Sequence, residues 1–218
     1  MTPDALEQEA QAAGLRLRGL FAPDPDAVLP EGTETLVLLG PDEPRFWPLF
    51  AASDEYRTRV ADPMDAWSKR VIGALAHDWG GSAIFPSDGP PWPPFIKWAT
   101  DCAEAWEAPV GLLVHHHAGL FLSFRGAIAL PFTVTRPNTF RRPCDTCTDQ
   151  PCVTVCPVGA MAPGQPYDVP RCKTYLRTDA GQNCRENGCL VRRACPVSQE
   201  FTRHPEQAAF HMRAFLGN

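Results

Sequence analysis

The chain has 218 residues, 44% of them hydrophobic, and a formal net charge of −5. This length allows one large domain or two small ones. No apolar run approaches the ~20 residues that span a bilayer, so we expect no membrane span. Between Phe140 and Glu200 there are 8 Lys or Arg against 6 Asp or Glu, an excess too small to predict nucleic-acid binding.

The first third of the chain alternates helix and strand signals. In chain order, the expected elements are a helix at 4–13 ended by Gly14, a strand at 15–20, a buried strand at 33–39 and a short helix at 45–52. In the first strand, Leu15 and Leu17 alternate with Arg16 and Arg18. The alternation predicts that both arginines lie on the face opposite the leucines.

The clearest helix signal covers residues 62–79. Asp62 is expected to be its N-cap and Pro63 its first residue. Its apolar positions fall near one face and comprise Met64, Trp67, Val71, Leu75 and Trp79. Such a face can line a cofactor site, but packing into the core is the favoured interpretation.

The middle of the chain predicts one more helix and a strand pair. A proline-rich loop at 87–94 precedes a helix at 95–106, on which Cys102 is expected to be a buried small side chain. Strands at 110–115 and 120–130 are expected to form an antiparallel pair. Mixed elements that end in an antiparallel pair predict an α+β fold.

Three consecutive histidines, 115–117, lie at the end of the first of these two strands. Imidazole is a common metal ligand, but consecutive strand residues point to opposite faces and cannot all reach one ion. A turn with one ordered, hydrogen-bonded histidine is therefore favoured over a metal site.

Eight of the nine cysteines lie between residues 144 and 195, in two spaced runs. The first run is Cys144-x2-Cys147-x4-Cys152-x3-Cys156-Pro157, and the second is Cys172 followed by Cys184-x4-Cys189-x5-Cys195-Pro196. Runs of this kind that end in Cys-Pro hold [4Fe–4S] clusters, and in two-cluster proteins the fourth cysteine of each run ligates the other cluster. The longer gaps here are interpreted as loop insertions.

The crossed pattern predicts two sets of four ligands. One cluster would take Cys144, Cys147, Cys152 and Cys195, and the other Cys156, Cys172, Cys184 and Cys189. Three alternatives stay open: structural zinc, disulfides, and a second site that is vestigial or holds a smaller cluster. Disulfides are disfavoured because residues 1–14 carry no apolar signal stretch, which predicts a cytoplasmic, reducing location.

The cysteine segment resembles the C-terminal ferredoxin module of epoxyqueuosine reductase. The resemblance rests on the Cys-Pro ends of both runs and on Arg171-Cys172-x-x-Tyr175-Leu176. The short length counts against a full epoxyqueuosine reductase, because that family carries additional tRNA-binding structure that is not found in this sequence. The expected domain division is 1–135 and 136–218.

Residues 4–132 resemble the CblC-type cobalamin-processing proteins. The matching segments are Thr35-Leu36-Val37-Leu38-Leu39, Asp62-Pro63-Met64-Asp65 and Gly111-Leu112-Leu113-Val114-His115, followed by Gly119 and Phe124-Arg125-Gly126-Ala127. The resemblance implies a nitroreductase-like α+β domain that binds a corrinoid and a smaller ferredoxin-like domain that reduces it.

The resemblance also implies roles for single residues. Gly111, His115 and Arg125 match positions at the corrinoid or thiol site, although His116 and His117 stand where the family has Pro-Arg. Asp88 lies near the place of the aspartate that protonates the substrate of epoxyqueuosine reductase. Arg125 could instead form a structural salt bridge, and Asp88 could be an ordinary turn residue.

These patterns predict an iron–sulfur redox enzyme, a possible cobalamin reductase, that passes electrons through two [4Fe–4S] clusters to a corrinoid or flavin in the N-terminal domain. A redox partner protein would supply them. One alternative is an electron carrier of the ferredoxin type whose N-terminal domain only docks partners. Another is a corrinoid chaperone without turnover. Nothing in the sequence predicts an oligomeric state.

Overall fold

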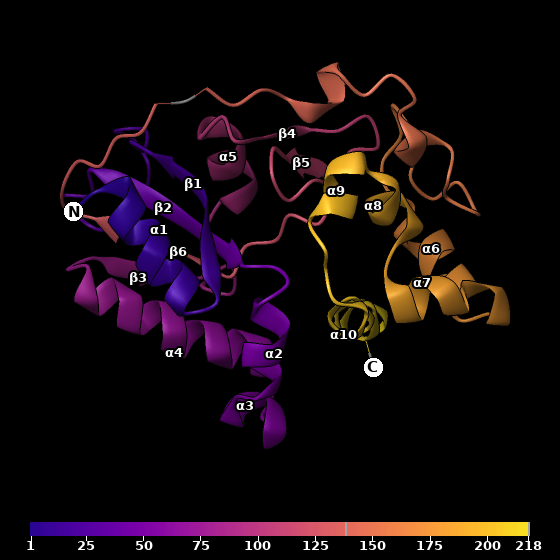
Figure 1. Ribbon diagram of the computed structural model, residues 1–218, viewed down its shortest axis with the longest axis horizontal. Coiled ribbons are helices and arrows are strands. Elements are labelled where there is room, and N and C mark those ends of the chain that lie inside the picture. The colour runs from indigo at the N-terminus through magenta and orange to yellow at the C-terminus, as the bar shows by residue number, and fades with distance from the viewer. Residues whose placement is uncertain (138, 218) are drawn as a thin grey trace. The chain divides into compact units, whose positions relative to one another are not determined.

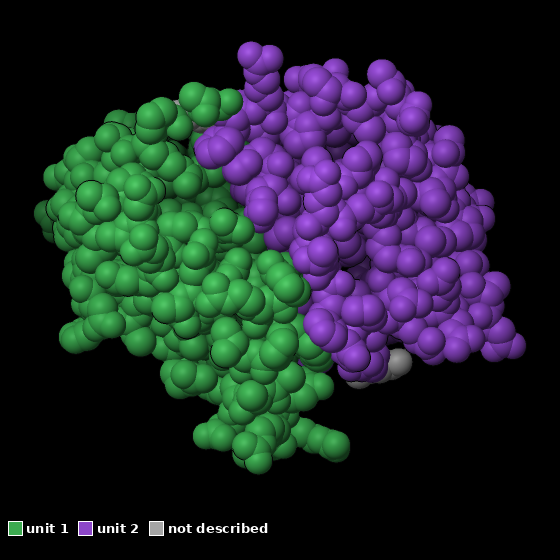
Figure 2. All heavy atoms as spheres, in the orientation of Figure 1, with its two compact units in different colours: residues 1–104, 123–139 green, residues 105–122, 140–218 purple. Residues whose placement is uncertain are grey.

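The computed structural model describes residues 1–137 and 139–217, which fold into two compact units. Unit 1 consists of residues 1–104 and 123–139, and unit 2 of residues 105–122 and 140–218 (Figure 2). Both units contain helices and antiparallel strands, which confirms the α+β class. None of the helices in the described residues has the length and hydropathy needed to cross a bilayer.

Unit 1 is built around a four-stranded antiparallel sheet with the strand order β1-β2-β6-β3 (Figure 1). Its elements are α1 (Pro3–Ala12), β1 (Leu15–Phe21), β2 (Thr35–Pro41), α2 (Phe46–Ala51), α3 (Asp54–Arg57), α4 (Pro63–Asp78), β3 (Ser82–Ile84), α5 (Phe95–Asp101) and β6 (Gly126–Leu130). Every residue of β2 and β6 is buried. Helices α1 and α5 contact β1, and α4 contacts β3 and β6.

The expected alternation of faces in β1 is interrupted at Arg18. A β-bulge between Leu17 and Gly19 interrupts the pairing of β1 with β2, and the side chain of Arg18 becomes buried. A bulge inserts one residue into one strand, so the two-residue alternation of faces no longer holds beyond it. Burial lowers the pKa of Arg18 to about 10, and its guanidinium donates a hydrogen bond to the carbonyl of Pro41.

The apolar face of α4 belongs to the core, as the favoured interpretation predicts. The ring of Trp67 packs edge-on against Phe46, with ring centres 5.2 Å apart. Asp62, however, adopts a left-handed conformation (φ 46°), and its side chain makes no capping bond. Asp62 is thus the N-cap by position and Pro63 the first helical residue, as expected, but the N-cap side chain forms no hydrogen bond to the helix.

Helix α5 is shorter than expected. It ends at Asp101, and Ala103 has a positive φ of 53°. A left-handed residue cannot continue a right-handed helix, so residues 105–106 lie instead in a strand of unit 2. Cys102 is buried, as predicted.

Unit 2 combines a hairpin from the middle of the chain with the cysteine-bearing segment. Its elements are β4 (Ala105–Glu107), β5 (Leu113–His115), η1 (Pro143–Asp145), η2 (Pro151–Val153), α6 (Val169–Leu176), η3 (Asp179–Gly181), α7 (Gln182–Asn187), α8 (Leu190–Ala194), α9 (Pro196–Glu200) and α10 (Pro205–Leu216). Strand β5 pairs with β4.

The expected pairing of residues 110–115 with 120–130 is wrong. Strand β6 pairs with β2 and β3 in the sheet of unit 1. The amide of Arg125 already bonds to the carbonyl of Leu39, which starts the register with β2. The hairpin at 105–122, counted with the N-terminal domain on sequence grounds, thus lies in unit 2.

Candidate metal centres

Four cysteines of unit 2 line one cavity of about 930 Å³. We call them the first cysteine group, and they are Cys144, Cys147, Cys152 and Cys195. Burial raises the pKa of the Cys144 thiol, Arg142 lowers it, and the thiols of Cys195 and Cys147 raise it further. The sulfur atoms are therefore close enough to act on one another electrostatically.

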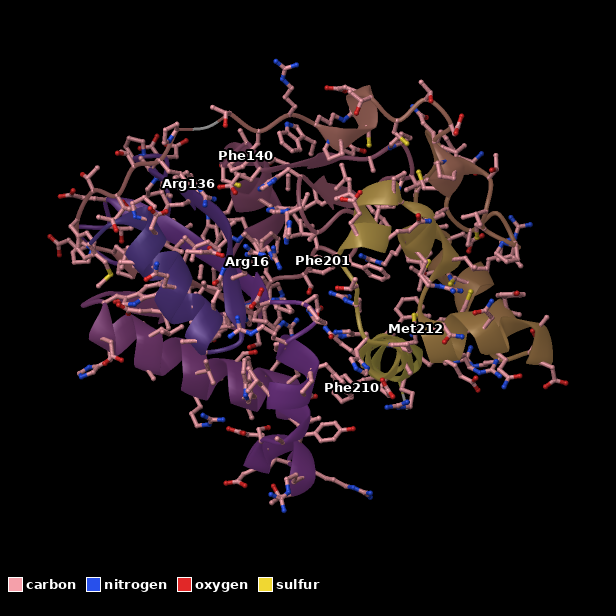
Figure 3. All side chains as sticks on the ribbon, in the orientation of Figure 1. Arg16, Arg136, Phe140, Phe201, Phe210 and Met212 are labelled. Atoms are coloured by element: carbon pink, nitrogen blue, oxygen red, sulfur yellow. The ribbon has the colours of Figure 1, made fainter. Side chains whose placement is uncertain are left out.

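The remaining walls of this cavity are mostly apolar. The hairpin at 105–122 contributes Trp106, Ala108, Val114 and Leu120. The ring of His116 stacks on Phe140 with ring centres 3.8 Å apart (Figure 3). Apolar walls lower the local dielectric constant, which strengthens electrostatic interactions inside the cavity.

The other four cysteines gather at α6, α7 and α8. This second cysteine group comprises Cys156, Cys172, Cys184 and Cys189. Burial raises the pKa of Cys172, a hydrogen bond from Tyr167 lowers it, and the thiols of Cys189, Cys156 and Cys184 raise it. Helix α10 covers this group through an apolar cluster that includes Leu216 and Met212 (Figure 3).

The two groups have the same members as the two ligand sets expected from the crossed spacing. The chain passes from one group to the other twice. Cys152 and Cys156 belong to different groups. Because they lie four residues apart, their Cα atoms are separated by at most about 14 Å. Cys189 and Cys195 flank α8, whose helical rise separates them by roughly 9 Å. Short connections therefore keep the groups close together. Cluster binding itself stays a prediction.

The cysteine sulfurs of the described residues do not form a preassembled zinc site. Among the residues that the structure describes, no three cysteine sulfurs lie within 4.8 Å of one another. A tetrahedral zinc with Zn–S bonds of ~2.3 Å holds its sulfurs about 3.8 Å apart. A four-iron cube puts a separate iron beneath each sulfur and needs wider separations. All nine cysteines are free thiols.

Three sulfur atoms of the second cysteine group accept hydrogen bonds. The amide of Ala160 donates to Sγ of Cys156 at 3.3 Å, and the Tyr167 hydroxyl donates to Cys172. The amide of Leu190 donates to Cys184. Donors of this kind stabilise the more negative, reduced state of a thiolate-bound cluster and raise its potential.

Arg192 of α8 was not singled out from the sequence. Burial lowers the pKa of its buried guanidinium, while Cys189 and Tyr167 raise it. The same guanidinium donates a hydrogen bond to the carbonyl of Leu120, which lines the cavity of the first group. Its positive charge therefore lies where it offsets negative charge on Cys189 of the second group. The only sequence signal is the Arg192-Arg193 pair between two cysteines.

Gly111 and His115 both shape the hairpin in unit 2. Gly111 has a positive φ of 74°, and its amide bonds to the carbonyl of Ala108 at 3.0 Å in the β4–β5 turn. His115 is 1% exposed, and its Nδ1 accepts hydrogen bonds from the amides of His117 (3.0 Å) and Ala118 (3.2 Å). These contacts make His115 an ordered, hydrogen-bonded histidine in a turn, which is the interpretation favoured from the sequence.

Arg125 and Asp88 lie in unit 1. The Arg125 guanidinium is 3.8 Å from the carboxylate of Asp65, and burial lowers the pKa of Arg125 while Asp65 raises it. Asp88 is exposed, and its Oδ2 accepts a hydrogen bond from the amide of Phe85 at 2.8 Å. The salt-bridge and turn alternatives thus describe contacts that these two residues make. Their catalytic and cofactor roles stay predictions.

No family model matches the chain, and the searches of curated proteins and of solved structures find no match. The resemblances to epoxyqueuosine reductase and to the CblC-type proteins therefore stay predictions that rest on the sequence motifs quoted above.

Proposed function

We propose that this chain is an iron–sulfur redox protein that holds two [4Fe–4S] clusters in unit 2. The observation that carries the proposal is the gathering of eight thiols into two groups, each with three cysteines from one run and the last cysteine of the other. Eight thiolates in two sets of four are what two such clusters require. A cluster in either group supplies one-electron transfer.

The residues around each group have distinct tasks in this proposal. The thiolates bind the iron, and the apolar walls of the first group keep water away. Amide and hydroxyl donors offset charge on the sulfurs of the second group. Arg192 compensates negative charge on Cys189 of the second group. Water exclusion and donors to sulfur are the main means by which a protein sets cluster potentials.

The acceptor in this proposal is a corrinoid or a flavin held with the help of a nitroreductase-like N-terminal domain. Its support is the resemblance of residues 4–132 to the CblC-type proteins, which includes Gly111, His115 and Arg125. The proposal that the C-terminal part is ferredoxin-like rests on its resemblance to the ferredoxin module of epoxyqueuosine reductase. The function would then be reduction or processing of cobalamin.

One observation favours the second candidate, an electron carrier of the ferredoxin type. Arg125 pairs with Asp65, and Asp88 closes a turn with Phe85. The expected cofactor and catalytic residues of unit 1 thus already have structural contacts. In this case unit 1 would serve to dock a redox partner protein.

Serine variants of the anaerobically reconstituted protein test the cluster assignment. Cys195→Ser and Cys144→Ser are expected to perturb the same EPR signal, and Cys189→Ser the other signal, because Cys195 belongs to the first group. The matched control is Cys102→Ser, which lies outside both groups and should leave both signals intact. If Cys195→Ser changed the same signal as Cys189→Ser, the crossed assignment would be wrong.

Titration with cobalamin separates the two candidate functions. If the first is correct, the visible bands of added cobalamin shift to the base-off form and the reduced clusters bleach them. If the clusters are present and the cobalamin bands do not change, the carrier function stands instead.

A further inference from the structure

The positive charge of the chain is concentrated around the second cysteine group. Residues 168–193 contain six Lys or Arg and three Asp or Glu, a net +3 within a chain whose total is −5. The rest of the chain therefore carries −8. The basic residues are Arg171, Lys173, Arg177, Arg185, Arg192 and Arg193.

None of these six cations forms an ion pair with a carboxylate among the described residues. Arg185 donates to the backbone carbonyl of Thr178 at 2.6 Å, and Arg193 donates to the side-chain carbonyl of Asn183 at 2.8 Å. The Nζ of Lys173 lies 5.1 Å from the ring centre of Phe215. Arg192 and Arg193 act electrostatically on Cys189 and Cys184. Of the six cations, those with neither a carboxylate nor a thiolate partner in the part of the chain that the structure describes are therefore Arg171, Lys173, Arg177 and Arg185.

Several cations of unit 1, in contrast, pair with carboxylates. Arg16 pairs with Glu7 at 2.7 Å, Arg70 with Glu55 at 2.5 Å, and Lys97 with Asp101 at 2.6 Å. An unpaired cluster of cations in an otherwise acidic chain has an electrostatic cost that a negatively charged partner removes.

The exposed members of the cluster lie beside the second cysteine group. Helix α6 carries Arg171, Cys172 and Lys173 in succession, and Arg177 is its C-cap. Arg171 and Arg177 are exposed, and Cys172 is half-buried. The three carboxylates of the segment include Asp168, whose Oδ1 caps α6 by accepting from the amide of Arg171 at 2.9 Å.

We propose that the face formed by α6 and the η3–α7 segment docks a small acidic electron-transfer protein, and that electrons enter through the second cysteine group. The inference rests on the proposed cluster binding and adds the entry site and the partner class. One electron leaves the reduced partner and converts a [4Fe–4S]²⁺ cluster to [4Fe–4S]⁺; no bond or proton changes. The hydrogen bonds to the second group stabilise its reduced state.

Stopped-flow reduction of the reconstituted full chain by reduced flavodoxin, an acidic flavin protein, tests the proposal. Iron content is measured first, so that a failure of the proposed function is recognised by itself. Arg171→Glu/Arg177→Glu should slow the second-order rate by about tenfold at low salt, and high salt should remove most of the difference. Reduction by dithionite should remain unchanged.

The matched control is Arg57→Glu/Arg59→Glu, which makes the same charge change at two exposed arginines of unit 1 and should keep the wild-type rate. Equal rates for both variants, or a rate independent of salt, would overturn the proposal. The proposal would also be overturned if reduction of the Arg171→Glu/Arg177→Glu variant by dithionite were slowed as much as its reduction by flavodoxin, because the effect would then lie on the cluster itself. If the variant kept the wild-type rate with flavodoxin but lost binding to an RNA oligonucleotide, the face would be assigned to nucleic acid and the proposal would be overturned as well.

Discussion

Tyr167 is the side chain that distinguishes the two cysteine groups most clearly. Burial raises the pKa of its hydroxyl, and the hydrogen bond with Cys172 raises it further, so the phenol keeps its proton and donates to sulfur. Its ring stacks on Phe215 of α10, with ring centres 6.2 Å apart. The donor is therefore held in place from both ends.

We predict that Tyr167→Phe lowers the reduction potential of the second cluster. Loss of one donor to sulfur destabilises the reduced state, by on the order of 50 mV, which is about 1 kcal/mol for a one-electron couple. EPR-monitored redox titration measures it. The control is Tyr175→Phe, because the Tyr175 hydroxyl donates to the carbonyl of Ala180 and not to sulfur. An equal potential in Tyr167→Phe and the wild type would contradict the assigned role.

At the scale of single residues, the burial of Cys102 was predicted correctly because its signal is local. The cysteine spacing is also a local signal, and the cluster binding that it indicates stays a prediction. Arg18 and Arg192 could not be placed this way. The burial of Arg18 depends on a bulge in the pairing with another strand, and Arg192 reaches a carbonyl 72 residues away. Neither contact has a periodic signature.

Helices α3 and α4 are joined by one charged contact. The Arg70 guanidinium bonds to both carboxylate oxygens of Glu55, at 2.5 and 3.1 Å. These hydrogen bonds lower the pKa of Glu55 to about 2. A carboxylate with a depressed pKa stabilises the folded state above its unfolded pKa, and loses that contribution as the pH falls towards its folded value.

We predict that Glu55→Gln removes a small, acid-sensitive part of the free energy of unfolding. The contribution should be present above about pH 4.5 and disappear towards pH 2. Because Arg70 is 59% exposed, solvent limits it to about 1 kcal/mol or less. Urea unfolding at several pH values measures it. If Glu55→Gln lost the same stability at pH 3 and pH 7, the ion pair would not be the cause.

The hairpin of unit 2 is attached to α9 through Ser198. The amide of Leu120 donates to Ser198 Oγ at 2.8 Å, and Ser198 is 2% exposed. A Cβ added to Gly119 would lie 2.5 Å from the same hydroxyl. The close approach positions Leu120 in the wall of the first cysteine cavity, next to the start of α9 at Pro196.

We predict that Ser198→Ala destabilises the protein by about 1–3 kcal/mol, because the buried amide of Leu120 loses its partner. The first cluster should also lose iron to a chelator faster, while the second keeps its rate. Thermal unfolding and the decay of each EPR signal measure the two effects. Ser87→Ala in an exposed loop is the control. Equal iron loss from both clusters would contradict the local explanation.

At the scale of the whole molecule, the chain enters unit 2 twice. Residues 105–122 supply the hairpin, and residues 140–218 supply the cysteines. The cavity of the first group is lined from both segments, for example by Trp106 and Cys144. The cysteine-bearing segment alone therefore lacks one wall of that cavity.

We predict that a fragment of residues 136–218 reconstitutes the first cluster poorly. Without the hairpin, the apolar cluster around Cys152 and Cys195 is exposed to water. Iron content should fall to about four per fragment, since the second group takes its cover from α10. Iron counting after gel filtration measures it. A fragment with two stable clusters would show that the hairpin is dispensable.

The strand pairing shows the limit of what could be predicted from the sequence. The α+β class followed from element types alone. The strand pairing did not, because residues 110–115 and 120–130 are adjacent in sequence but pair with different strands. Non-local pairing depends on packing across the whole sheet, which single-sequence patterns do not encode.

The central claim is that the eight cysteines hold two four-iron clusters. Iron, acid-labile sulfide and zinc should be counted in the anaerobically reconstituted full chain. The account predicts about eight irons and eight sulfides per chain, with negligible zinc. About four irons would reduce the claim to one functional site, and stoichiometric zinc without sulfide would contradict it.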